Sequence, residues 1–171
     1  MSKFIISGIV VLAIAGGGIL LLGQGGKDQG TTLTKTKSQF QDLRFVDYKG
    51  DTVALADFAR KPLVVNAWAT WCPFCIKELP DLVSLQKEFP EVVVIAIDRA
   101  ESLNTVKSYT DALGVSEDLI FLLDRKDSFY ESIGGFTMPE TIFVDAEGVI
   151  QDHTRGIMNL DEMKLKVKNI L

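Results

Sequence analysis

The chain has 171 residues, of which 47% are hydrophobic, and its 18 basic and 23 acidic residues give a formal net charge of -5 at pH 7. This length suits one ordinary domain plus an appendage, and the composition excludes a disordered chain, a collagen and a multi-span membrane protein. The acidic balance argues against nucleic acid as a partner, because no basic surface is available to displace the counterions of phosphates.

The N-terminal segment is predicted to be a transmembrane anchor. Residues 4–23 carry no charge, and at about 1.5 Å per residue a helix of this length reaches roughly 30 Å, the thickness of a bilayer's hydrocarbon core. Lys3 precedes this segment, which predicts that residues 1–3 stay in the cytoplasm and that the C-terminal side is exported. A cleaved signal peptide is the alternative, because residues 13–15 (Ala-Ile-Ala) resemble a cleavage site. Cleavage there would leave an apolar stub at the new terminus, so the anchor is favoured.

Residues 24–37 are rich in Gly, Gln, Thr and Lys, which predicts a flexible tether, and residues 38–171 are predicted to form the folded domain. Apolar runs predict strands at residues 45–47, 52–55, 63–69, 92–97, 119–123, 141–144 and 149–154, and helices at residues 73–89, 102–113, 128–133 and 161–171. The first two strands flank a turn and form a hairpin. The fold class expected from this order is α/β, with a mixed central sheet covered by helices on both faces.

The motif most specific for a chemical function is Trp71-Cys72-Pro73-Phe74-Cys75, which contains both cysteines of the chain. It lies where a predicted strand ends and a helix begins, so Cys72 is expected at the N-cap and Pro73 at the first helical position. The helix N-terminus stabilises a thiolate, which makes Cys72 the expected nucleophile. Cys75 lies one turn further on and is the expected buried resolving thiol, which closes a disulfide with Cys72. A static disulfide or two inert thiols are the less favoured alternative.

Glu78 is the second candidate for chemistry. On a helical wheel it shares a sector with Leu82, Leu85 and Phe89, on the side of Cys75. A carboxylate among apolar neighbours loses solvation, so its pKa is expected to rise, and Glu78 is expected to exchange protons with Cys75. The alternative is that Glu78 points into solvent and only favours the start of the helix.

The sequence resembles the TlpA-like branch of the thioredoxin superfamily, whose members are membrane-tethered thiol:disulfide oxidoreductases of the bacterial envelope. The resemblance begins at Leu55-Ala56-Asp57-Phe58, runs through residues 66–75 with Glu78 and Pro80, and continues through Asp124 to residues 138–145 with Gly148. It covers nearly all of residues 40–171 and implies a thioredoxin-like fold. One departure is the Pro-Phe pair between the cysteines, where the family often has Glu-Pro, and this leaves the direction of electron flow open.

The resemblance also implies the substrate-binding residues. The proline that matches Pro139 follows a cis peptide bond in the family, and the backbone of the preceding residue, here Met138, pairs with the bound substrate. Trp71 and Phe74 are expected to form an apolar rim with Met138 around the exposed sulfur, with Pro73 between the cysteines also in contact with substrate. Glu140 stands where a threonine is common and is expected to add negative charge close to the site.

The activity implied is exchange of the Cys72–Cys75 dithiol with protein substrates of the cell envelope, as a reductant in processes such as cytochrome c maturation. The domain would face the extracytoplasmic side of a bacterial cytoplasmic membrane, anchored once by residues 4–23, and would receive electrons from a membrane donor. No metal and no cofactor beyond the redox-active disulfide are expected, because two cysteines and one histidine do not complete a zinc site. The alternatives are a disulfide-introducing oxidase and a non-enzymatic adaptor that delivers Cu(I) or haem.

Overall fold

The computed structural model describes residues 39–171. The predicted cytoplasmic end, membrane anchor and tether, residues 1–37, lie outside the described residues. Among the helices of residues 39–171, none is both long enough and apolar enough to cross a membrane.

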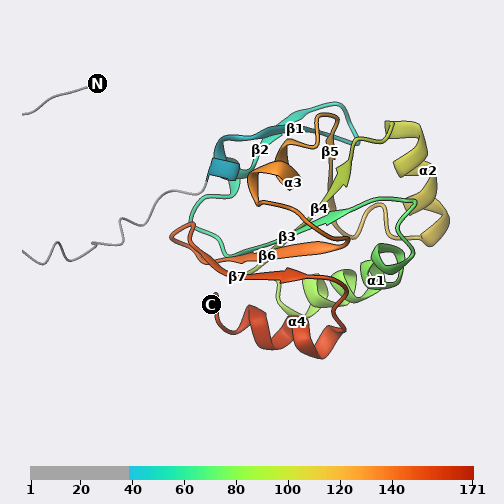
Figure 1. The fold of residues 1–171 in the computed structure, drawn as a ribbon. Helices are drawn as coiled ribbons and strands as arrows, with labels where there is room; N and C mark the ends of the chain where they lie inside the picture. Colours follow the sequence, from blue (N-terminus) through green and yellow to red (C-terminus); the bar gives the residue numbers. More distant parts are fainter. Residues whose placement is uncertain (1–38) are drawn as a thin grey trace, which may run out of the picture. The chain divides into compact units, whose positions relative to one another are not determined.

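The described residues form an α/β domain whose order of elements follows the predicted one (Figure 1). The strands are β1 (Arg44–Asp47), β2 (Thr52–Ala54), β3 (Leu63–Trp68), β4 (Val93–Arg99), β5 (Ile120–Asp124), β6 (Glu140–Val144) and β7 (Ile150–Arg155). The helices are α1 (Pro73–Glu88), α2 (Leu103–Leu113), α3 (Ser128–Ser132) and α4 (Leu160–Val167), with short 3-10 helices η1 (Gln39–Asp42) and η2 (Leu55–Phe58).

All seven strands form one sheet in the order β2-β1-β5-β4-β3-β6-β7. β3 pairs in parallel with β4, and β4 with β5, whereas the other neighbours are antiparallel. The inner strand β3 is buried along its whole length, as expected for a strand with neighbours on both edges and helices on both faces. The expected mixed sheet with an N-terminal hairpin is therefore confirmed.

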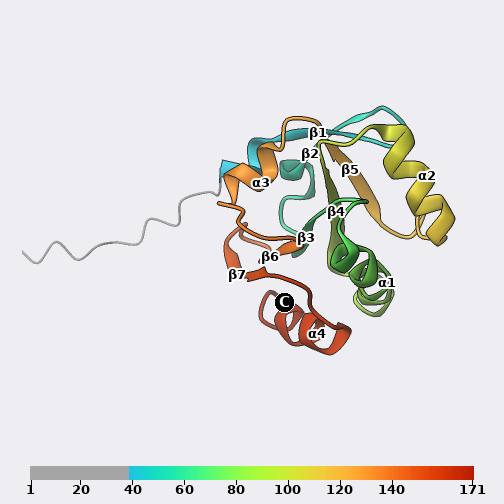
Figure 2. The same cartoon turned by 45° about the vertical axis from the view of Figure 1, so that its right-hand side comes forward.

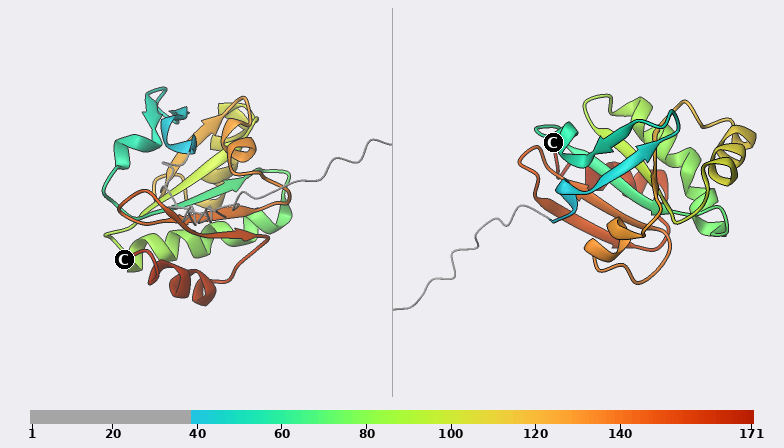
Figure 3. Two further views of the ribbon diagram at one scale, coloured as in Figure 1. Left: turned by 60° about the vertical axis from the view of Figure 1, so that its left-hand side comes forward. Right: turned by 90° about the horizontal axis from the view of Figure 1, so that it is seen from above.

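Helices cover both faces of this sheet (Figures 2 and 3). One apolar cluster contains Leu79 of α1, Val106 of α2 and Met163 of α4, together with the side chains that β3 and β4 direct to that face. The other cluster contains Phe129 of α3 and the aromatic and aliphatic residues of η1 and η2. Because successive residues of a strand point to opposite faces, each residue of β3 and β6 belongs to one face or the other.

The C-terminal helix is shorter than predicted. Its start is fixed by Asn159, whose side chain accepts the N–H of Glu162 while the Glu162 carboxylate accepts the N–H of Asn159. The helix was predicted to run to residue 171, but α4 ends at Val167. The following turn is tighter, since the N–H of Ile170 bonds to the carbonyl of Val167 at 3.0 Å, and this turn buries the Ile170 side chain in the core.

Candidate active site

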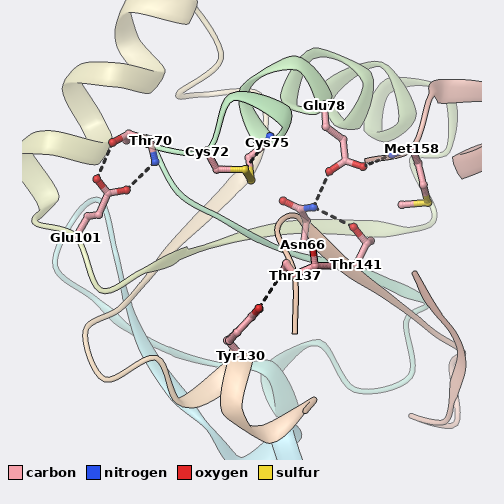
Figure 4. The surroundings of a disulfide bond; sticks show 10 residues. All are labelled: Asn66, Thr70, Cys72, Cys75, Glu78, Glu101, Tyr130, Thr137, Thr141 and Met158. Carbon is pink, nitrogen blue, oxygen red and sulfur yellow. Dashed lines mark hydrogen bonds between the residues drawn. A yellow bond between two sulfur atoms is a disulfide. The ribbon is translucent and has the colours of Figure 1, made fainter. Parts of the chain in front are cut away.

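The two cysteines lie where β3 leads into α1 and form a disulfide in this structure (Figure 4). Cys72 is the N-cap residue of α1, and its sulfur accepts the N–H of Cys75 at 3.1 Å. Pro73 occupies the first helical position, where the N–H that proline lacks has no partner within the helix. The dithiol is thus held against the positive end of a helix, which favours the thiolate form of Cys72.

Cys72 is more buried than the sequence suggested, whereas Cys75 is buried as expected of the resolving thiol. Cys72 is 3% exposed and Cys75 is 1% exposed, and both belong to the apolar cluster on the α1 face of the sheet. The expectation of an exposed sulfur at Cys72 is therefore wrong for the disulfide form, because its sulfur is bonded to Cys75 and also accepts an N–H. Trp71 and Phe74 behave as expected of a rim, with 61% and 54% of their surfaces exposed on either side of Cys72 in the sequence.

Glu78 is buried on the same helix, three residues after Cys75, with 1% of its surface exposed. Its two carboxylate oxygens accept hydrogen bonds from Asn66 Nδ2 at 3.0 Å and from the backbone N–H of Met158 at 2.9 Å (Figure 4). Burial raises the pKa of Glu78 to about 7, although both hydrogen bonds act to lower it. The group can therefore both hold and release a proton near neutral pH, one helical turn from the resolving thiol.

Asn66 links Glu78 to the sheet. Its side-chain nitrogen also donates to Thr141 Oγ1 at 2.9 Å, and Asn66 and Thr141 are register partners on β3 and β6. A single buried amide thus connects α1, β3 and β6, the strand that follows Pro139. Asn66 was not predicted as a site residue, although it lies within the run of residues 66–75 that resembles the TlpA-like proteins.

Replacing Asn66 with alanine is expected to lower the free energy of unfolding by about 2 kcal/mol, because it leaves the Glu78 carboxylate with one donor fewer in a buried site. Loss of a hydrogen bond to the anionic form also raises the pKa of Glu78 further. Urea unfolding at two pH values measures both effects, with Ser84→Ala on the exposed side of α1 as the control. An Asn66→Ala chain as stable as the wild type at about pH 8 would contradict this role.

The peptide bond between Met138 and Pro139 is cis, and Met138 packs against the apolar cluster that contains both cysteines. The carbonyl of Pro139 accepts the N–H of Gly156 at 2.9 Å, which ties the start of β6 to the end of β7. Trp71, Met138 and Pro139 thus lie on the segments that lead into α1 and β6, and Phe74 lies in the first turn of α1. Pro73 is exposed at the first turn of α1, between the two cysteines.

Glu101 was not predicted, yet it holds the loop in front of Cys72. Its carboxylate accepts the backbone N–H of Thr70 at 2.7 Å and the Thr70 hydroxyl at 2.6 Å (Figure 4). The N–H of Glu101 in turn bonds to the buried carboxyl of Asp98 at 3.0 Å, and burial raises the pKa of Asp98 to about 8. The sequence held one indication of this contact, since Thr70 and Glu101 each follow a predicted strand. Because β3 and β4 are parallel, the segments after them meet at one edge of the sheet.

Glu140 does not lie where it was expected. It is fully buried, and it pairs in register with Ala67, so its side chain is on the face of α3 rather than the face of α1. Its carboxylate contacts His153 Nε2 at 2.6 Å instead of adding charge beside the dithiol.

Within the described residues 39–171, no group of three or more His, Cys, Asp or Glu side chains is arranged to hold a metal ion. The chemistry that this part of the chain offers is that of the dithiol, with a carboxyl group of raised pKa behind it.

Comparison with known proteins agrees with this chemistry. The family model described as Redoxin matches residues 35–171. The chain belongs to the Redoxin family. It is 29% identical over 157 residues to the thioredoxin-like protein YneN of Bacillus subtilis, an alignment that covers 87% of this chain and 92% of that protein. It is 27% identical over 129 residues to the thiol-disulfide oxidoreductase ResA of Halalkalibacterium halodurans, covering 74% of this chain and 72% of the relative.

A solved structure of dsbF from MTB, described in its mixed oxidized and reduced forms, superposes on this redoxin domain with a TM-score of 0.71 at 24% identity. It covers 77% of this chain and 96% of that one, which confirms the thioredoxin-like fold. Together with the Cys72–Cys75 pair, these matches identify the chain as a thiol:disulfide oxidoreductase and confirm the resemblance to the TlpA-like proteins.

Proposed function

We propose that this redoxin reduces disulfides of proteins on the outer side of a bacterial cytoplasmic membrane, with apocytochrome c among its substrates. In the proposed cycle the Cys72 thiolate attacks one sulfur of a substrate disulfide and expels the other as a thiolate. Cys75, deprotonated by Glu78, then attacks the sulfur of Cys72 and releases the second substrate thiolate. Two electrons pass to the substrate, and the chain is left with the Cys72–Cys75 disulfide.

The observation that carries the direction is the placement of carboxyl groups around the dithiol. Glu101 is bonded to Thr70, two residues before Cys72, and Glu78 lies one turn behind Cys75. A strong oxidant needs a stabilised thiolate in its reduced form, whereas negative charge near the dithiol disfavours that thiolate. This arrangement therefore favours a reductant.

A protein substrate is supported by the surroundings of the dithiol. Trp71 and Phe74 are large, apolar and exposed, which is typical of a surface that binds another protein. The relative ResA carries the name thiol-disulfide oxidoreductase, and we extend that activity to protein thiols in this chain. Residues 4–23 would anchor the domain, and a membrane dithiol donor would return it to the reduced state. The cysteine pair carries the electrons itself, so the proposed reaction requires no other cofactor.

The reduction potential of the Cys72–Cys75 pair tests the direction. We expect a value near that of thioredoxin, roughly −270 mV, when the full chain in mild detergent is equilibrated in glutathione buffers. A value nearer −120 mV would contradict the proposal and assign the chain the reverse reaction, disulfide introduction. If the two cysteines form no disulfide at any ratio of oxidised to reduced glutathione, and bind Cu(I) stoichiometrically instead, the result would support a metal-delivery adaptor.

A further inference from the structure

Glu140 is a fully buried carboxylate that the proposed cycle does not use. It is the first residue of β6, directly after Pro139, and none of its surface is exposed. One carboxylate oxygen accepts the backbone N–H groups of Phe136 and Thr137, the latter at 2.7 Å. The other oxygen lies 2.6 Å from His153 Nε2 on the edge strand β7.

These contacts account for the burial of the charge. Taking a carboxylate out of water is costly unless it is hydrogen-bonded and paired. Burial acts to raise the pKa of Glu140, but the N–H groups of Thr137 and Phe136 and the contact with His153 outweigh it and hold the pKa below its usual value. The guanidinium of Arg155 adds a longer ion pair at 3.7 Å. Glu140 is therefore an anion at neutral pH whose partners are a loop and β7.

The loop that Glu140 holds is the one that leads into the cis peptide bond. Tyr130 on α3 fastens the same loop from the other side, because its hydroxyl donates to the carbonyl of Thr137 at 2.8 Å (Figure 4). With its N–H bonded to Glu140, Phe136 keeps its ring in solvent, where 86% of the residue is exposed. Since Thr137 is bonded at both its N–H and its carbonyl, the backbone just before Met138 has little freedom to move.

We infer that Glu140 is a positioning residue, which fixes residues 136–139 so that the backbone of Met138 and the ring of Phe136 meet a segment of a substrate protein, with His153 as its anchor on β7. This inference rests on the proposed function, because it concerns protein disulfides. A small disulfide without a peptide segment makes no use of this loop, so its reaction with Cys72 does not depend on Glu140.

The test compares two substrates, insulin as a protein disulfide and hydroxyethyl disulfide as a small one, with the full chain in mild detergent. Glu140→Gln keeps the shape of the side chain but loses its charge, and we expect the KM for insulin to rise about tenfold with kcat within about twofold. We expect the rate with hydroxyethyl disulfide and the reduction potential of the cysteine pair to stay close to the wild-type values.

His153 offers a second pair of variants, which leave the buried carboxylate of Glu140 in place. His153→Leu removes the donor to Glu140 and is expected to raise the KM for insulin, whereas His153→Gln keeps a donor and is expected to restore it. The matched control is Asp152→Asn, the neighbouring residue on β7, whose side chain pairs with Lys166 of α4 on the other face. If Glu140→Gln no longer unfolds cooperatively on heating, the comparison of His153→Leu with His153→Gln tests the positioning role on its own.

Equal losses with insulin and hydroxyethyl disulfide would overturn the inference, because they would show an effect on the dithiol or on folding rather than on substrate placement. An unchanged KM in Glu140→Gln and His153→Leu, or an equal effect of Asp152→Asn, would overturn it as well. A wild-type chain that reduces hydroxyethyl disulfide but leaves insulin oxidised would instead refute the proposed function, and this inference with it.

Discussion

Replacing Cys72 with serine is expected to lower the rate of disulfide reduction by about a thousandfold or more, because a hydroxyl does not ionise near neutral pH to give the attacking anion. Replacing Cys75 with serine is expected to stop the cycle one step later. The Cys72 thiolate still attacks the substrate, but no second thiol releases it. The two variants therefore differ in what accumulates, although both lose turnover.

The mixed disulfide that accumulates distinguishes the two steps. The Cys75→Ser chain, mixed with oxidised insulin, is expected to gain the mass of insulin by mass spectrometry, and a reducing agent should remove it. Cys72→Ser is expected to gain none, because Cys75 lies one turn inside α1 and lacks the N-cap position at which the sulfur of Cys72 accepts a backbone N–H. Ser84→Ala, on the same helix, should behave like the wild type. A Cys72→Ser chain that traps insulin would reverse the assigned roles.

Much of the fold was predictable because the helices and strands are indicated by patterns of neighbouring residues in the sequence. The apolar run of β3 and the Cys-Pro start of α1 follow one another directly, so the strand, its end and the helix N-cap are predicted together. The burial of Glu78 was predicted from its place on the apolar side of α1, a periodicity that needs no knowledge of the rest of the fold. The shorter α4 was missed because its last turn depends on burial of Ile170 in the core.

The contacts that position the loops were not predictable in the same way, because they join residues far apart in the sequence. Glu101 reaches Thr70 across 31 positions, and nothing near either residue indicates the other. Glu140 was wrongly expected to add charge close to the dithiol because the register of its strand with β3 was unknown. Thr141 pairs with Asn66 on the α1 face, so the strand alternation places Glu140 on the opposite face. Phe136 was missed because an exposed aromatic in a loop has no periodic pattern.

Replacing Glu78 with glutamine is expected to slow the second step of the cycle by about a hundredfold at pH 8, because the variant has no base to take the proton of Cys75. In the wild type the rate of this step should rise as Glu78 loses its proton through about pH 7. The variant should lose that inflection. Single-turnover release of a substrate held on Cys72 measures this step alone, and Glu88→Gln at the end of the same helix is the control.

The pH dependence of the free energy of unfolding gives an independent measure of the ionisation of Glu78. The pKa of Glu78 is raised from 4.5 to about 7 in the folded chain, so the folded state favours the protonated carboxyl. The contribution of Glu78 to the free energy of unfolding is fully present below about pH 4.5 and is lost as the pH rises through about 7. Between about pH 4 and pH 8 the wild type should therefore lose about 3 kcal/mol more of its free energy of unfolding than Glu78→Gln does.

The two measurements for Glu78 separate proton transfer from burial. If the carboxyl is buried but takes no part in the cycle, the stability difference between wild type and Glu78→Gln persists while the release rates coincide at every pH. If Glu78 is the base for Cys75, the inflection in the release rate and the fall in stability occur at the same pH, because one proton controls both. Release rates in Glu78→Gln that match the wild type at about pH 8 would therefore remove Glu78 from the cycle, whatever its effect on stability.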